Sequence, residues 1–263
     1  MVKTAEIIQF FEKAVPNEMK MDFDNVGFLV GDSQRDVDSA LVSLDITDEV
    51  VSEAIALGAG LIVSHHPMFF QLKSVTDATP EGRKIVKLLR ANISAICLHT
   101  SLDSVQGGVN DALIKTLGCS NLGILEPEQE LPDGRVYGCG RFGELPEAKR
   151  MAGFLEKVKT ALRSNGLRYY DAGVPVKRIA VCGGSGGSMI ADAVLRGCDT
   201  YVTADIKYDQ FLTAKELGLN IIDADHFCTE NVVVPVIAGM LNRNFPKLDV
   251  KISAKHTQCI KFY

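Results

Sequence analysis

The sequence has no Cys-x-x-Cys pair, no run of lysine and arginine, and no long uninterrupted apolar stretch. Its seven cysteines are odd in number and scattered. This pattern argues against a secreted disulfide framework or a cysteine-type zinc site and favours buried thiols in a reducing cytosol. Without a basic run, the chain lacks the usual electrostatic footprint of a nucleic-acid-binding protein. Since no stretch approaches the length of a transmembrane helix, we expect a cytoplasmic protein with no membrane partner.

The bulk composition is that of an ordinary globular protein. Apolar residues make up 46% and charged residues 23% of the 263 residues, and the formal net charge is −5. These values disfavour extended disorder, and the length suits one large domain or two small ones. At the N-terminus, residues 1–13 mix Ile7, Ile8, Phe10 and Phe11 with polar residues, which predicts an amphipathic helix rather than a signal peptide.

Strand-like and helix-like segments alternate along the chain. The expected strands are 40–46, 61–64, 94–98, 176–183, 200–204 and 220–224, and the expected helices are 48–57, 82–91, 189–197 and 209–218. Strands separated by helices of this length indicate βαβ units. We therefore expect an α/β protein made of two α/β lobes with mainly parallel or mixed sheets.

Turn-forming residues, Pro127 among them, fill 125–143 and predict loop or short antiparallel structure there. We interpret this segment as the join between the lobes. The first lobe would then comprise 1–124 plus 232–263, and the second would comprise 125–231.

Histidines follow three of the expected strands. His65 and His66 come after one strand, His99 after another and His226 after a third. A single histidine after a strand is most often a hydrogen-bonded structural residue. Because ligands bind at the carboxyl ends of parallel strands, three strands that each deliver histidine to that edge favour a metal site.

Two carboxylates each lie four residues after one of these histidines. Asp103 lies four residues after His99, and Glu230 lies four residues after His226. In a helix, each pair would share one face. Pro235 places the start of the next helix near 233–235, so 226–230 would form a separate turn.

The adjacent pair His65-His66 precedes Pro67, which disfavours the helical region for His66. In an extended chain the two imidazoles would point to opposite sides, which suits two ions better than one. In two-metal hydrolases the ions lie about 3.5–4 Å apart. Two divalent ions among three neutral histidines and two carboxylates retain positive charge, which favours an anionic substrate.

Six segments together resemble a known family. They are DNVGFLVGD (24–32), SHHPMFF (64–70), HTSLDSVQGGVND (99–111), IAVCGGSGG (179–187), TADIKY (203–208) and DADHFCTE (223–230). Their order is similar to that of the Nif-three-like family, whose members often carry the label "GTP cyclohydrolase I type 2 homologue". The resemblance spans nearly the whole chain.

The resemblance implies two divalent metal ions per subunit, in the cleft between the two lobes. Carried over by motif, the implied ligands are His65, His66, Asp103, His226 and Glu230. Asp103 and Glu230 are the natural bridging residues, and His99 would line the site as a ligand or a catalytic general acid/base. Zinc, iron, manganese, nickel and cobalt all remain candidates. The family also commonly forms ring-like homohexamers.

For function, the resemblance implies a metal-dependent hydrolase, cyclohydrolase-like or phosphoesterase-like, that acts on a nucleotide or another anionic small molecule. The alternative is a non-catalytic metal-binding adaptor or metal-handling protein. The chain departs from the family where Tyr208 and Asp209 replace a common histidine, and where Asp225 and Cys228 replace small residues. These departures bear on substrate preference more than on metal binding. Cys228 is either a soft extra ligand or a buried spectator.

Two glycine-rich loops leave alternatives open. Residues 182–188, CGGSGGS, join a strand to a helix but lack the Gly-Lys-Ser/Thr of a P-loop. They form either a tight turn beside the cleft or a cradle for a substrate phosphate. Gly107 and Gly108 would similarly permit close backbone approach, with Asn110 helping to start the next helix.

Overall fold

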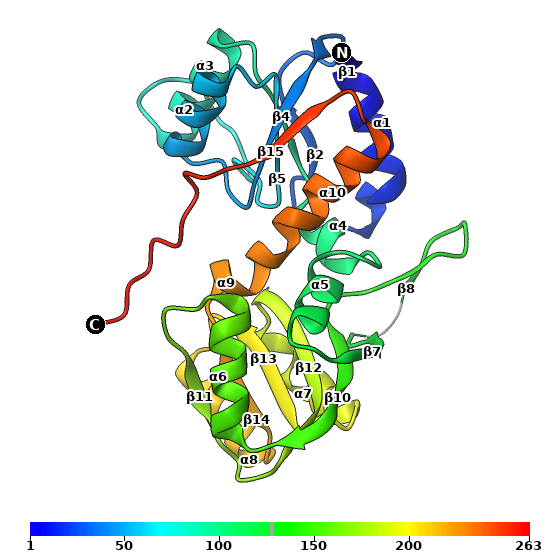
Figure 1. Cartoon of the computed structure of the whole chain (residues 1–263), viewed down its shortest axis with the longest axis vertical. Helices are drawn as coiled ribbons and strands as arrows, with labels where there is room; N and C mark the ends of the chain where they lie inside the picture. The colour runs from blue at the N-terminus through cyan, green and yellow to red at the C-terminus, as the bar shows by residue number, and fades with distance from the viewer. Residues whose placement is uncertain (127–128) are drawn as a thin grey trace. The chain divides into compact units, whose positions relative to one another are not determined.

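The computed structural model describes residues 1–126 and 129–263. These residues form two compact units, each with its own mixed β-sheet (Figure 1). Unit 1 comprises Met1–Leu102 and Val233–Thr257, and unit 2 comprises Asp103–Val232 and Gln258–Tyr263. The expected α/β class is confirmed.

Unit 1 contains a five-stranded sheet in the order β15-β4-β5-β6-β2. Its strands are β2 (Gly27–Val30), β4 (Ser39–Ser43), β5 (Leu61–Ser64), β6 (Ser94–Cys97) and β15 (Asp249–Ile252). All neighbouring strands are parallel except β2, which is antiparallel to β6. The smaller elements are β1 (Val2–Lys3), which pairs with β3 (Asp36–Val37), and the short helix η1 (Asn17–Met19).

The helices of unit 1 begin and end at clear local signals. They are α1 (Thr4–Ala14), α2 (Asp48–Leu57), α3 (Pro80–Arg90) and α10 (Val234–Asn244), with α4 (His99–Ser104) at the boundary between the units. Thr47 caps α2 by accepting a hydrogen bond from the backbone N–H of Val50, and Gly58 ends it at φ 66°. Figure 1 shows α2 and α3 on one face of the sheet and α1 and α10 on the other.

The parallel register brings three strand ends to one edge of this sheet. Val63 of β5 is level with Val42 of β4 and with Ile96 of β6. The residues that follow these strands, among them Asp45, His65 and His99, therefore emerge at the same edge.

Unit 2 contains a six-stranded sheet in the order β11-β14-β13-β12-β10-β7. Its strands are β7 (Ser120–Ile124), β10 (Arg141–Lys149), β11 (Arg168–Tyr170), β12 (Val176–Ser185), β13 (Thr200–Ala204) and β14 (Asn220–Asp223). The central three, β12, β13 and β14, are parallel, and the outer pairings are antiparallel.

The helices of unit 2 are α5 (Val109–Thr116), α6 (Met151–Leu162), α7 (Ile190–Leu195), α8 (Tyr208–Glu216) and α9 (His226–Glu230). The short helices η2 (Gly187–Met189) and η3 (Asn231–Val233) precede α7 and α10. Apolar side chains of α5 and α6 pack with those of the central strands in one buried core, including Leu113, Phe154, Val181 and Val202.

The segment expected to join two lobes contains a small hairpin of β8 (Gln129–Glu130) and β9 (Val136–Tyr137). Short antiparallel structure was expected there, and Pro127 lies outside the described residues. The compact units divide between Leu102 and Asp103, earlier than the expected 124/125. The reason is that the 103–124 segment supplies β7, which pairs with β10.

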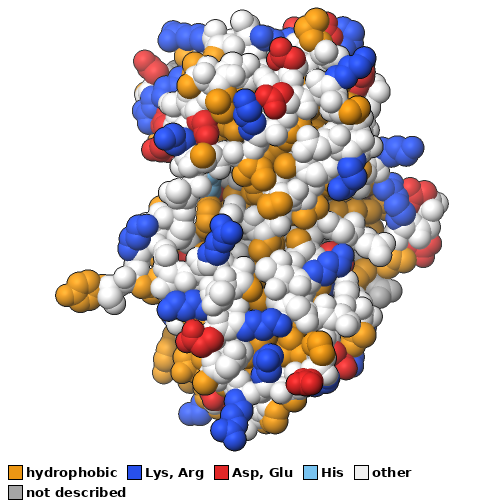
Figure 2. All heavy atoms as spheres, in the orientation of Figure 1, with side chains coloured by type: hydrophobic (Ala, Val, Ile, Leu, Met, Phe, Trp, Pro, Cys, Tyr) orange, Lys and Arg blue, Asp and Glu red, His pale blue; other side chains and the backbone are white. Residues whose placement is uncertain are grey.

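No helix in the described ranges is both long and apolar enough to cross a lipid bilayer. On the face that Figure 2 displays, acidic and basic side chains are interspersed over the surface. This mixed pattern is consistent with the absence of a lysine and arginine run from the sequence.

Candidate functional site

Three imidazole rings gather at the sheet edge of unit 1. His65 and His66 follow β5, and His99 opens α4 after β6. The ring centroid of His65 lies 4.8 Å from that of His66 and 5.4 Å from that of His99. One ring nitrogen from each histidine lies within 4.8 Å of the other two. Such spacing is compatible with a shared cation.

The expected divergence of His65 and His66 is wrong. The chain bends at these residues, and their backbone N–H groups donate to the neighbouring carbonyls of Ser43 (3.4 Å) and Leu44 (2.9 Å). In a regular strand, successive N–H groups point to opposite sides. Because the chain turns here, the two rings lie near each other with their planes tilted by 47°.

Aspartates hold two of these rings through Nδ1. His66 Nδ1 lies 2.7 Å from Asp45 Oδ1, and His99 Nδ1 lies 2.7 Å from Asp24 Oδ1. An ionised carboxylate only accepts hydrogen bonds, so Nδ1 carries the proton and the lone pair is on Nε2. Metal sites use this carboxylate–histidine arrangement to fix the tautomer of a ligand.

The environment of Asp24 keeps its carboxylate ionised. Burial raises the pKa of Asp24, but hydrogen bonds from His99 and Thr100 outweigh that effect and lower it to about 2. The backbone N–H of Thr100 donates to Asp24 Oδ2 at 3.1 Å. The start of α4 therefore fixes both the carboxylate and the imidazole that it holds.

His256 lies behind His66. Its Nε2 is 2.9 Å from Asp45 Oδ2, so one carboxylate holds both imidazoles. Burial lowers the pKa of His256, although Asp45 opposes that shift. This partly buried position, shared with His66 on one carboxylate, fits an outer support of the site.

In unit 2, His226 and Glu230 lie one turn apart on the same face of the short helix α9. His226 Nε2 lies 3.1 Å from Glu230 Oε2, and His226 Nδ1 lies 2.7 Å from Asp205 Oδ2. The expected separate turn at 226–230 is confirmed, because α10 starts only at Val234 with Pro235 in its first turn. Asp225 caps α9 by accepting from the N–H of Cys228 at 3.1 Å.

The two carboxylates proposed as ligands also lie close together in unit 2. A carboxylate oxygen of Asp103 and one of Glu230 are within 4.8 Å of each other. Both residues are buried. Buried carboxylates at this spacing repel each other unless a cation or a proton is shared between them.

The glycine-rich segment 182–188, which spans the end of β12, packs against Glu230 and matches the tight-turn alternative. Its N–H groups at Gly183, Gly184 and Gly186 donate to side-chain oxygens of Asn110 (2.9 Å), Thr229 (3.0 Å) and Thr203 (3.0 Å). Those groups are therefore occupied within the protein. A Cβ on Gly184, whose φ is +64°, would lie 2.2 Å from Glu230 Oε1, so the absence of a side chain makes room for the carboxylate.

Asn110 does not start α5 in the expected way, since Gly108 is the capping residue. The buried Asn110 side chain instead donates from Nδ2 to the backbone carbonyl of Asp103 at 3.0 Å, and its Oδ1 accepts from Gly183. One amide thus ties the backbone at Asp103 to the loop that packs on Glu230.

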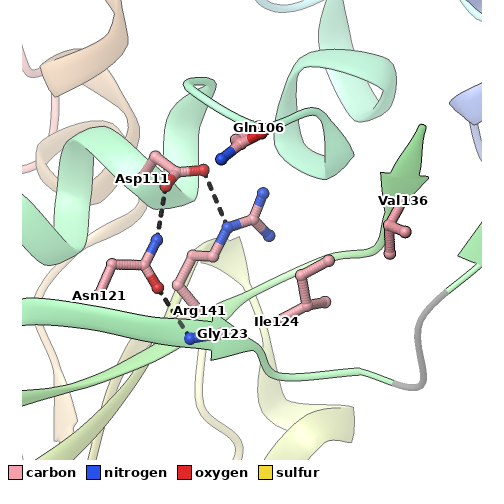
Figure 3. Close-up of a pocket in the computed structure, with 7 residues that line it drawn as sticks. All are labelled: Gln106, Asp111, Asn121, Gly123, Ile124, Val136 and Arg141. Carbon is pink, nitrogen blue, oxygen red and sulfur yellow. Dashed lines mark hydrogen bonds and ion pairs between the residues drawn. The ribbon is translucent and has the colours of Figure 1, made fainter.

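A pocket of about 270 Å³ in unit 2 has a charged lining (Figure 3). Arg141 Nε donates to Asp111 Oδ2 at 2.9 Å, and Asn121 donates to Asp111 Oδ1 at 2.6 Å. The other four guanidinium N–H groups donate to backbone carbonyls, those of Ser104, Val105, Gly138 and Gly140. This arginine braces the chain just after Asp103 and has no N–H left for a ligand.

All seven cysteines lie in the described part of the chain and carry reduced thiols. The expected burial is confirmed for six and wrong for Cys259, which is exposed in the C-terminal segment. Burial raises the pKa of Cys228 to about 12, with Asp225 adding to the shift. Since only a thiolate is a good metal ligand, Cys228 fits the spectator alternative.

The three aspartates that hold imidazoles were not among the residues expected at the site. Asp24 and Asp205 stand inside two of the segments that carry the family resemblance, and Asp45 follows β4 as the histidines follow their own strands. Their position in those motifs and at strand ends was the available signal.

The Duf34/NIF3 (NGG1p interacting factor 3) family matches residues 2–259. The chain belongs to this family. A NIF3-family relative from Clostridium perfringens, named "GTP cyclohydrolase 1 type 2 homolog", is 38% identical over 231 residues, 87% of each chain. A relative of the same name from Clostridium acetobutylicum is 34% identical over 95% of this chain and 93% of its own.

Solved NIF3-like structures share the fold. A Bacillus cereus protein described as related to NIF3 has a TM-score of 0.91 at 26% identity and covers 99% of both chains. Staphylococcus aureus protein SA1388 also has a TM-score of 0.91, at 29% identity, over 100% of this chain and 99% of its own. The resemblance that the six segments indicated is confirmed.

Proposed function

We propose that this NIF3-family protein is a dinuclear metal-dependent hydrolase that acts on a nucleotide or another anionic small molecule. One observation carries the metal-binding part of the proposal. His66, His99 and His226 each bond through Nδ1 to an aspartate at 2.7 Å. An aspartate bound to Nδ1 of an imidazole is the arrangement that orients metal-binding histidines, and here it occurs three times.

The nitrogen and oxygen atoms of the proposed ligands suit divalent ions. The proposed ligands are His65, His66, Asp103, His226 and Glu230. Imidazole nitrogen and carboxylate oxygen together suit zinc, iron, manganese, nickel and cobalt. The closeness of the Asp103 and Glu230 oxygens supports a bridging role, since a shared cation removes the repulsion between the two carboxylates.

Two such ions, when bound, would supply Lewis-acid polarisation of the substrate and activation of water near neutral pH. His99 would move the proton, because Asp24 holds its Nδ1–H and leaves Nε2 able to accept or donate. Asn110 and the loop at Gly183 would keep Asp103 and Glu230 in position. The relatives' name points to cyclohydrolase chemistry on GTP, and a phosphoesterase would use the same residues.

The test is metal reconstitution followed by a nucleotide screen. Protein purified without added metal is loaded with each candidate ion, and formate and phosphate release are measured over a panel of nucleoside phosphates. We expect turnover in the wild type and its loss in Glu230→Gln. Glu144→Gln, which alters only a surface ion pair with Arg178 in the same unit, is the matched control and should keep full activity.

A protein that binds two ions but is inert in both assays would support the other function, a metal-binding adaptor. The family description itself, which names an interacting factor, gives that alternative some weight. We also propose the homohexamer that the family resemblance implies. Sedimentation should then give six times the 28.5 kDa chain mass.

A further inference from the structure

Two exposed phenyl rings lie beside the histidine cluster of unit 1. The Phe23 residue is 64% exposed and the Phe70 residue is 51% exposed. Their ring centroids are 6.1 Å apart, and the Phe70 ring lies 5.8 Å from the His99 ring. Leaving this much aromatic surface in water is unfavourable, so the pair is a candidate contact surface for a ligand.

The backbone beneath these rings is held in place by the two residues that follow Phe23. Next to Phe23, Asp24 holds His99 through Nδ1 at 2.7 Å. Asn25 then donates from Nδ2 to the backbone carbonyl of Phe69 at 2.9 Å, which ties this segment to the turn that presents Phe70. The two rings therefore stand on anchored backbone next to the proposed proton-transfer histidine, which lowers the ordering cost of binding.

We propose that Phe23 and Phe70, whose ring planes are tilted by 53°, form an aromatic platform that binds the planar heteroaromatic ring of the substrate, a nucleobase, with its face on one ring and its edge toward the other. This proposal rests on the proposed function and adds what selects the substrate. Every base has a π-face, and aromatic side chains recognise single bases by stacking on them. A small molecule fits better than a protein partner, because two rings offer far less than the roughly 800 Å² that each side of a stable interface buries.

Placement beside His99 gives the platform a role in orientation. A base held on Phe70 would be held next to the His99 imidazole, since the two rings are already in contact distance. Holding one end of a substrate beside the reacting group raises the rate by fixing orientation. A phosphate tail alone would not use this surface.

The experiment compares GTP with inorganic tripolyphosphate, which has the charges without the base. Affinities are measured by calorimetry on metal-loaded protein, with metal content determined in parallel. In Phe23→Leu/Phe70→Leu, which keeps apolar bulk but removes the π-faces, we expect about a 10-fold weaker GTP affinity. Tripolyphosphate affinity and metal content should not change.

Two variants sharpen the result. Phe70→Tyr keeps the aromatic face and should retain GTP affinity. Phe10→Leu makes the same substitution at another aromatic pair of unit 1, in which the ring centroids of Phe10 and Phe245 are 5.5 Å apart. It should leave the affinities for GTP and tripolyphosphate unaltered.

The platform is refuted if the double variant lowers the affinities for GTP and tripolyphosphate equally, or lowers neither. It is refuted as well if the double variant changes the oligomer mass while its GTP affinity stays that of the wild type. It is also refuted if the wild type does not bind GTP. A wild type that binds GTP through these rings but never turns over a nucleotide would instead reject the hydrolase proposal and leave the platform intact.

Discussion

An aspartate bound to Nδ1 of an imidazole determines which ring nitrogen is left for a ligand. Asp45 illustrates this at the scale of one residue, because its Oδ1 meets His66 and its Oδ2 meets His256. A negative charge at that position makes the Nε2 lone pair of His66 more basic and therefore a stronger metal ligand. A neutral amide in its place would weaken that effect and would also place N–H groups against the rings.

We therefore expect Asp45→Asn to weaken metal affinity by about 10- to 100-fold while the fold persists. The measurement is competition with a chromogenic chelator, together with far-UV circular dichroism. Asp48→Asn is the control, since Asp48 lies three residues further on and forms its ion pairs with Lys87 and Arg83 at the surface. Equal affinities in Asp45→Asn and the wild type would contradict this assignment.

Asp24 gives a prediction about acid stability. Its pKa in the folded protein is about 2, below the ordinary value of 3.8. The folded state therefore favours the ionised form, and the stabilisation is present above pH 3.8 and lost as the pH falls toward 2. Asp24→Asn should be less stable than the wild type at pH 7, and the difference should narrow below about pH 4.

Urea unfolding of metal-free protein, with a chelator present throughout, measures this difference between pH 7 and pH 3. A gap between wild type and Asp24→Asn that stays constant over the whole range would show that the carboxylate's ionisation is not linked to folding. Asp133→Asn, which removes an exposed carboxylate, provides the reference for an ordinary surface change.

At the scale of elements, the end of β12 must pass Glu230 with no side chain in the way. Gly184→Ala would introduce a Cβ 2.2 Å from Glu230 Oε1 at a φ of +64°. Gly173 has a similar φ of +76° but nothing within 4 Å of its Cβ, so Gly173→Ala isolates the conformational strain, about 1–2 kcal/mol.

Gly184→Ala is expected to be less stable than Gly173→Ala and to lose metal affinity, because Glu230 must move. Thermal unfolding and metal titration of both variants test this. If Gly184→Ala binds metal as well as Gly173→Ala does, the loop does not position the carboxylate.

The sequence predicted the elements that have strong local signals. The helix α2 and the strand β5 lie at the expected residues, 48–57 and 61–64. It did not predict β10, which contains Gly143 and Pro146, residues typical of turns. Gly143 is required there because a Cβ would lie 2.2 Å from the carbonyl oxygen of Ser120 on the paired strand, a contact that no local pattern reveals.

The histidines of the candidate site could be predicted from the sequence, but the aspartates that bind them could not. Asp24 and His99 are 75 residues apart, and the other two pairs are each separated by 21. Such contacts depend on which strand ends meet at a sheet edge, and that depends on the order of strands in the whole sheet. The bend at His65 and His66 arose the same way, from backbone bonds to the chain after β4.

At the scale of the whole molecule, each unit supplies a different kind of donor. Unit 1 brings together three imidazoles, and unit 2 brings together two carboxylates and one imidazole. Both sets are attached to units with large apolar cores of their own. In the proposed metal site, stability and cation binding would be linked, because ligands held by the native packing are dispersed once either core unfolds.

This linkage predicts a large response to metal removal. A site that binds the native state alone stabilises it by about 2.7 kcal/mol when free metal is 100-fold above the dissociation constant. Chelation should therefore lower the midpoint of thermal unfolding, and added metal should restore it in proportion to the logarithm of its concentration. Glu230→Gln should respond much less, whereas Glu144→Gln should respond as the wild type does. A midpoint that is the same with metal and with chelator would mean that these side chains hold no ion in the native protein.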